Sequence, residues 1–155
     1  MAGDLTDAGL KVLSGLGQLE SLDLSFCRFG EQSLQSLTAL RNLKRLGLSQ
    51  TKVTDTAMEW VAQLSKLEAL SLEYTTVGDA GFAKLAGLTA LSELQLDHTE
   101  VSDATVKVLA GFSGLKYVDA YHTSISQEGY ESLKKSLPGC KINWSLDATK
   151  RERRT

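Results

Sequence analysis

Apolar residues recur along this chain with a fixed period of 24 residues, in three columns that hold mostly leucine. The second column follows the first after three residues, and the third follows after two more. The members are Leu19, Leu43, Leu67, Leu91 and Leu115; Leu22, Leu46, Leu70, Leu94 and Val118; and Leu24, Leu48, Leu72, Leu96 and Ala120. No insertion or deletion interrupts the period, and Ile142 and Trp144 continue it near the end of the chain. The pattern predicts an array of stacked repeats.

Each repeat combines two hydrophobic periods. Around the leucine columns, apolar and polar residues alternate, which predicts a half-buried strand. Further along the repeat, apolar residues lie three apart, as in Met58, Val61 and Leu64, with polar or charged residues between them. This second pattern predicts an amphipathic helix. Each repeat is therefore expected to run from a strand through a turn into a helix and back through a loop.

Such repeats predict an α/β solenoid in the form of a horseshoe segment. Successive strands pair in parallel, because each connection returns through a helix on the other side of the sheet. Helices are about 10 Å wide and strands about 4.8 Å, so the parallel sheet lies on the concave face and the helices on the convex face. We expect one such domain over residues 1–146, with about five repeats and a cap at each end.

Polar residues keep the same period. Hydroxyl side chains after each strand are expected to satisfy backbone groups where the chain leaves the sheet. They are Thr51, Thr75, Thr99 and Thr123, with Cys27 in the same place. Two residues later, a bulky side chain is expected to fill the core between strand and helix. These residues are Phe29, Val53, Val77, Val101 and Ile125.

Aspartates precede several of the expected helices. Helix starts are predicted at Thr6-Asp7, Thr54-Asp55 and Ser102-Asp103, where the helix dipole also favours a carboxylate. A structural role explains these aspartates without any catalytic one.

The LxxLxL columns, the Thr/Cys column and the segments Thr6-Asp7-Ala8-Gly9-Leu10 and Val77-Gly78-Asp79-Ala80-Gly81-Phe82 resemble the leucine-rich repeat family. The chain is most similar to its short αβ repeats, of the ribonuclease-inhibitor-like and F-box-associated cysteine-containing kind, with threonine in place of their asparagine or cysteine. The resemblance covers residues from about 5 to 146. It implies a solenoid that binds other proteins on its concave face.

The two ends of the array differ. Residues 137–144 predict a shortened final strand with Trp144 as a cap, and the polar, basic tail over 147–155 is expected to be disordered. Residues 6–16 predict a helix with no strand before it, so the first strand has an unpaired edge. We hypothesise that the chain is truncated from a longer array, or else associates with itself through this edge.

Size and charge narrow the classes of function. The chain has 155 residues and a formal net charge of −2, whereas a dedicated nucleic-acid-binding domain is normally strongly basic. No apolar run approaches the roughly 18 residues that a membrane span requires. The first residues also lack the regions of a signal peptide. We therefore expect a cytoplasmic protein that binds neither nucleic acid nor membranes.

The two cysteines are not expected to form a disulfide. Cys27 follows the first strand and Cys140 begins the last, which places them roughly 20 Å apart. A disulfide requires Cα atoms within about 7 Å of each other. The spacing of these cysteines fits no zinc motif either.

Variable side chains between the leucines are expected to line the concave face, with opposite charges at its two ends. The N-terminal end carries Arg28, Arg45 and Lys52. The other half is acidic and aromatic, and exposed tyrosines are good interface anchors. The predicted partner-binding residues are Glu73, Tyr74, Glu93, Asp97, His98, Tyr117, Asp119, Tyr121 and His122. They favour a partner protein or peptide with a basic segment; the alternative is a structural segment of a longer chain, with ordinary solvated side chains here.

One group of side chains suggests metal chemistry. His98 and His122 lie one strand apart, beside Asp97 and Asp119, and imidazole and carboxylate groups can hold a divalent metal. The histidines can also act as a pH switch. Because neighbouring strands always bring equivalent positions together, the metal site is kept as an alternative and no cofactor is assigned. No buried nucleophile, glycine-rich phosphate-binding loop or HExxH motif supports catalysis, so we expect no enzymatic activity.

Overall fold

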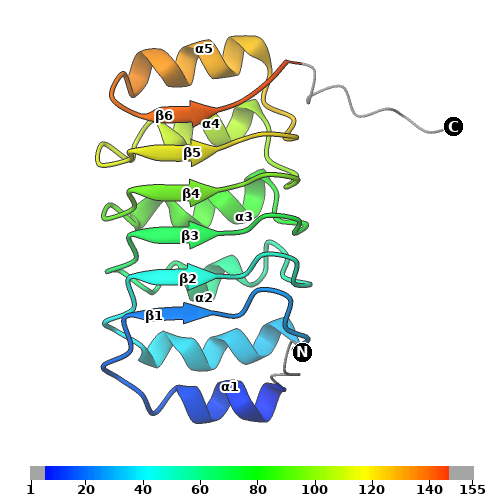
Figure 1. The fold of residues 1–155 in the computed structure, drawn as a ribbon, viewed down its shortest axis with the longest axis vertical. Helices are drawn as coiled ribbons and strands as arrows, with labels where there is room; N and C mark the ends of the chain where they lie inside the picture. The colour runs from blue at the N-terminus through cyan, green and yellow to red at the C-terminus, as the bar shows by residue number, and fades with distance from the viewer. Residues whose placement is uncertain (1–5, 147–155) are drawn as a thin grey trace, which may run out of the picture.

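The computed structural model describes residues 6–146 as a stack of strands with helices behind them (Figure 1). The first half contains α1 (Asp7–Leu13), β1 (Ser21–Asp23), the 3₁₀ helix η1 (Glu31–Ala39), β2 (Arg45–Gly47), α2 (Met58–Val61) and β3 (Ala69–Ser71). The second half contains α3 (Asp79–Ala83), the 3₁₀ helix η2 (Lys84–Gly87), β4 (Glu93–Gln95), α4 (Asp103–Leu109), β5 (Tyr117–Asp119), α5 (Gln127–Ser136) and β6 (Lys141–Asn143).

The strands form one parallel sheet in the order β1 to β6, and this confirms the predicted solenoid. Every pair keeps the register of the sequence period, so that Leu22 lies opposite Leu46 and Val118 opposite Ile142. The ladder continues beyond the short strands, where the Leu48 N–H donates to the Ser71 carbonyl at 2.9 Å. We use concave face for the side of this sheet that is turned away from the helices.

The leucine columns form a continuous core. Leu43, Leu67 and Leu91 of the first column are fully buried. Leu19 and Leu22 are only half-buried, because they belong to the repeat of β1, which lies at the edge of the sheet. The bulky column after the turns is buried as predicted at Val53, Val77, Val101 and Ile125, whereas Phe29 is partly exposed.

The helical segments are shorter and tighter than the predicted amphipathic helices. The α-helices have between 4 and 10 residues, and the second repeat has only the 3₁₀ helix η1. An apolar spacing of three matches three residues per turn, so Leu34, Leu37 and Leu40 are all buried. Two predicted boundaries were wrong: α1 ends at Leu13, and α2 begins only at Met58.

The threonine column closes the turns as predicted. The Thr51 hydroxyl donates to the carbonyl of Leu48, three residues earlier, at 2.6 Å. The same bond recurs in the next three repeats, at Thr75, Thr99 and Thr123. All four threonines are buried, so each hydroxyl satisfies a carbonyl where water has little access.

Five carboxylates with the same period of 24 connect neighbouring repeats, and we name them the carboxylate ladder. They are Asp7, Glu31, Asp55, Asp79 and Asp103. Each accepts a hydrogen bond from the backbone N–H that lies 23 residues further along, at 2.7–3.0 Å. The sequence predicted helix starts at Asp7, Asp55 and Asp103. Helices do begin at Asp7 and Asp103, but their carboxylates bind the following repeat.

Asp79 makes the largest number of these inter-repeat bonds. Its carboxylate accepts from the N–H and the hydroxyl of Ser102 and from the hydroxyl of buried Thr105. Burial acts to raise the pKa of Asp79, but the hydrogen bonds from Ser102 and Thr105 outweigh it and the pKa is lowered. Beside Asp55 and Asp103, the positions that correspond to Thr105 are occupied by Gly81 and Gly129, where a Cβ would collide with the carboxylate. The carboxylate ladder therefore requires a small or hydrogen-bonding residue at the position of Gly81, Thr105 and Gly129.

The C-terminal end of the core is covered by Trp144, as predicted. Its indole Nε1–H donates to the Ile125 carbonyl at 3.0 Å. Its ring stacks on Tyr130 with 4.6 Å between ring centroids. The predicted tail over 147–155 lies outside the described residues. Within the described part, Cys27 and Cys140 are both free, and no helix has the length and apolar character needed to cross a membrane.

The carboxylate ladder yields a stability prediction. Replacing Asp79 with alanine removes the acceptor for two hydroxyls and one backbone N–H, so we expect the free energy of unfolding to fall by about 2 kcal/mol. Chemical denaturation followed by circular dichroism measures this change. The control is Glu59→Ala, an exposed carboxylate on α2, for which we expect a change within about 0.5 kcal/mol. Equal effects of the two variants would contradict a structural role of the ladder.

A second prediction concerns the stability of the folded chain at low pH. The pKa of Asp79 is lowered from its ordinary value of 3.8, so its ionised form stabilises the folded state. That contribution is complete above the ordinary pKa and is lost as the pH falls through the lower folded-state pKa. The stability difference between the wild type and Asp79→Ala should stay constant from about pH 7 to pH 5 and shrink below about pH 4. Denaturation curves at several pH values test this, and a difference that grows with acidification would refute it.

Candidate functional site

Each of the strands β1 to β5 is followed by a turn in which one residue adopts a left-handed backbone conformation. Five residues share this place, with φ between 48° and 63°: Phe26, Gln50, Tyr74, His98 and His122. We name them the turn column. None of them is glycine, and a left-handed conformation costs other residues about 1–2 kcal/mol. The turn aims these side chains along one edge of the sheet, at the carboxyl ends of the strands.

Aromatic rings of the turn column stack from one repeat to the next. Tyr74 stacks on His98 with 4.2 Å between ring centroids and 13° between planes. The ring centroids of His98 and His122 lie 4.1 Å apart, and Tyr121 contacts His122 edge-on with 4.1 Å between ring centroids. The structure thus brings four of the predicted binding residues into one row, which we name the aromatic row.

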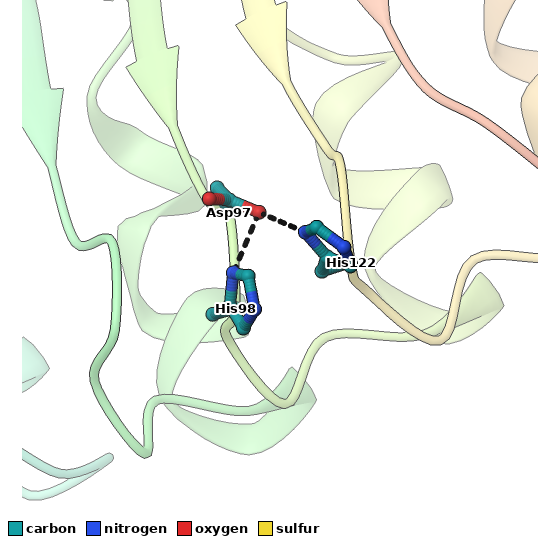
Figure 2. A group of neighbouring side chains, drawn as sticks. All are labelled: Asp97, His98 and His122. Atoms are coloured by element: carbon teal, nitrogen blue, oxygen red, sulfur yellow. Dashed lines mark hydrogen bonds and ion pairs between the residues drawn. The ribbon is translucent and has the colours of Figure 1, made fainter. Parts of the chain in front are cut away.

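Asp97 links the two histidines of this row (Figure 2). Its Oδ1 accepts a hydrogen bond from Nδ1 of His98 at 2.9 Å and from Nδ1 of His122 at 3.0 Å. The Asp97 side chain is 17% exposed, and those of His98 and His122 are 36% and 38% exposed. One carboxylate oxygen therefore contacts both imidazoles.

Asp119 does not join the histidines, so its predicted place among the metal ligands was wrong. It accepts instead from the Tyr117 hydroxyl at 3.3 Å, the Tyr121 N–H at 3.1 Å and Asn143 Nδ2 at 3.0 Å. Burial, followed by the negative charge of Asp119, raises the pKa of Tyr117. Among residues 6–146, one set of three or more potential metal ligands lies close together, namely Asp97, His98 and His122.

A groove of about 380 Å³ crosses the concave face over β1 to β4. Small residues of neighbouring strands line it: Ser25, Gly47, Ser49 and Ser71. Of the predicted binding residues, Glu73, Tyr74 and Glu93 line this groove, and the others lie outside it. The sequence places these small residues on the concave face, but they were not among the predicted partner-binding residues, although small residues at such positions indicate a hollow.

The ends of this surface carry opposite charge, as the sequence indicated. Arg45 lines the groove, and Arg28 and Lys52 line a second hollow of about 860 Å³ beside it. Phe26 lies between the two hollows and is 58% exposed. At the other end, Glu73 points its carboxylate toward the hydroxyls of Ser49 and Ser71, at 3.3 and 3.5 Å.

Known proteins share both the sequence pattern and the fold. A family model described as Leucine Rich Repeat matches residues 18–40. A leucine-rich repeat protein of Leptospira interrogans is 25% identical, with a TM-score of 0.67 over 85% of this chain. Two internalins of Listeria monocytogenes share the fold: one is 17% identical, with a TM-score of 0.63 over 90% of this chain. The other, internalin C2, is 22% identical, with a TM-score of 0.62 over 94%.

This chain is shorter than these structures. It spans 33% of the Leptospira chain, 47% of the first internalin and 71% of internalin C2. The comparison with curated proteins gives no match.

The turn column yields a prediction about backbone strain. Gln50 shows that glutamine fits this left-handed turn, whereas a β-branched side chain is strongly disfavoured there. We expect His98→Val to be about 1–2 kcal/mol less stable than His98→Gln. Thermal and chemical denaturation of both variants give the difference, and equal stabilities would show that the turn relaxes.

Proposed function

We propose that this chain, which belongs to the leucine-rich repeat proteins, is a protein-interaction module that binds a partner protein or peptide and is not an enzyme. The binding surface is formed by the aromatic row together with the acidic part of the concave face. The observation that carries the proposal is that none of the nine predicted binding residues is buried, although they lie on and beside a closely packed sheet. Such a rigid, accessible and chemically mixed surface suits recognition of another chain.

Charge favours a partner with a basic segment. Glu73, Glu93, Asp97 and Asp119 lie on three neighbouring repeats, whereas Arg28, Arg45 and Lys52 lie toward β1 and β2. Opposite charge steers association and fixes the orientation of a bound chain. A basic segment would therefore lie over β3 to β5, with its acidic or neutral part toward Arg45.

Tyrosines supply the apolar contact area. The Tyr74 side chain is 50% exposed, and its ring is already held against His98. Tyr117 lies beside Lys141, whose Nζ is 5.9 Å from the ring centroid. Rings that are ordered before binding lose little freedom when a partner covers them, which improves affinity.

The alternative function is a structural segment of a longer chain, with no ligand on this surface. The short span of this chain relative to the first two matched structures motivates that alternative. Self-association through the free edge of β1 is a further proposal, and light scattering of the chain alone tests it.

The binding proposal predicts that Tyr74→Ala, Tyr121→Ala and His122→Ala together remove partner binding. Truncating central anchors at an interface commonly costs 2 kcal/mol or more each, so we expect at least roughly a hundredfold loss of affinity. An array of peptides that differ in net charge identifies a basic ligand, and fluorescence anisotropy then measures its affinity for each variant. Unfolding midpoints confirm that the variants remain folded.

The matched control changes the basic end of the same surface, with Arg28→Ala, Arg45→Ala and Lys52→Ala. These substitutions should leave the affinity for a basic peptide unchanged or slightly higher, because they remove repulsion. Unchanged affinity in the aromatic variant would contradict the proposed site. Absence of any peptide binding would favour the structural alternative.

A further inference from the structure

We propose that Asp97, His98 and His122 form a binding site for a divalent transition-metal ion, and that Zn²⁺ is the ion they suit best. This inference concerns a ligand of the chain itself and does not depend on the proposed partner. It starts from the observation that one potential ligand atom from each of the three residues lies within 4.8 Å of the other two.

The distances between the ligand atoms are close to those of a zinc site. Zinc bonds to imidazole nitrogen and carboxylate oxygen are about 2.0–2.2 Å long, so neighbouring ligand atoms in a tetrahedron lie roughly 3.3–3.5 Å apart. The observed Nδ1–Oδ1 distances are 2.9 Å for His98 and 3.0 Å for His122. Admitting an ion requires these distances to lengthen by roughly 0.3–0.6 Å.

The chemistry of the donors selects a borderline cation. Two imidazoles and one carboxylate suit Zn²⁺ and its neighbours Co²⁺ and Ni²⁺ better than Ca²⁺ or Mg²⁺, which prefer oxygen ligands alone. The ion would replace the two hydrogen bonds that Asp97 accepts. Each imidazole would bind the metal through Nδ1, and Asp97 would bind it through a carboxylate oxygen.

Surrounding groups orient the ligands. Tyr74 stacks on one face of His98, and Tyr121 contacts His122 edge-on, so both imidazoles are held near Asp97. The histidine side chains are about one-third exposed, which leaves a position for water or for a side chain of a bound partner. Three protein ligands with an open position is a known arrangement for zinc.

A metal titration tests this site directly, on untagged protein with Cys27→Ser and Cys140→Ser so that no thiolate contributes. The chain contains only two histidines, so histidine-dependent binding must involve His98 and His122. We expect one Co²⁺ per chain, with the intense visible absorption of four-coordinate cobalt, and displacement of that Co²⁺ by Zn²⁺. Isothermal titration calorimetry gives the stoichiometry and the Zn²⁺ affinity.

Single ligand variants should weaken the Zn²⁺ affinity by more than about tenfold, because even an outer-shell partner of a metal ligand can contribute that much. The variants are His98→Gln, His122→Gln and Asp97→Asn. Glutamine already occupies the same turn at Gln50, so the histidine variants are expected to fold, and unfolding midpoints verify this. The matched control is Asp119→Asn, a neighbouring carboxylate outside the cluster, which should change the affinity less than about twofold.

Three results would overturn the metal site. The first is a titration without saturable one-to-one binding. The second is binding that survives both His98→Gln and His122→Gln. The third is an equal loss in Asp119→Asn and Asp97→Asn, which would mean a general attraction of cations to an acidic surface. Because no partner peptide is present, failure here leaves the proposed binding function untouched.

Discussion

Each repeat can satisfy its backbone only through its neighbours, and this requirement governs the whole molecule. The strands are three residues long, which is too short to be stable alone. They persist because the strands pair 24 residues apart, while the carboxylate ladder bonds the same neighbours at the start of the helical segments. A residue inserted between a strand and the following ladder carboxylate would put the two sets of hydrogen bonds out of register with each other.

The same regularity creates the surface. Because β1 to β5 all end in the same left-handed turn, residues of the turn column lie one strand spacing apart, about 4.8 Å. Rings at that spacing come into contact, as Tyr74, His98 and His122 do. After Gln50, Tyr74, His98 and His122, a buried threonine stabilises the turn by donating to the carbonyl three residues earlier, and Cys27 takes this place after Phe26. The left-handed turn that is part of the fold therefore also presents the side chains of the turn column, which differ from repeat to repeat.

Two parts of this surface have different physical characters. The groove over β1 to β4 is hollow because glycine and serine replace larger residues there, so it offers space. The cluster around Asp97 is filled, and it offers directed hydrogen-bonding or metal-binding groups instead. Glu73 and Tyr74 border the groove, and the ring of Tyr74 also contacts the cluster through His98. A partner that spans both parts would meet an apolar ring at their boundary.

The sequence by itself determined the repeat length, the parallel order, the buried leucines and the threonine turns, because these follow from a local period that stacking preserves. It also indicated where charge and aromatic residues collect. Only the tertiary structure decided that the Asp79 carboxylate binds the next repeat, that α2 starts late, and that Asp97 rather than Asp119 joins the histidines. Those outcomes depend on side-chain rotamers and on competing donors from adjacent repeats. A periodic pattern places residues in the same column, but it does not say which neighbour each side chain turns toward.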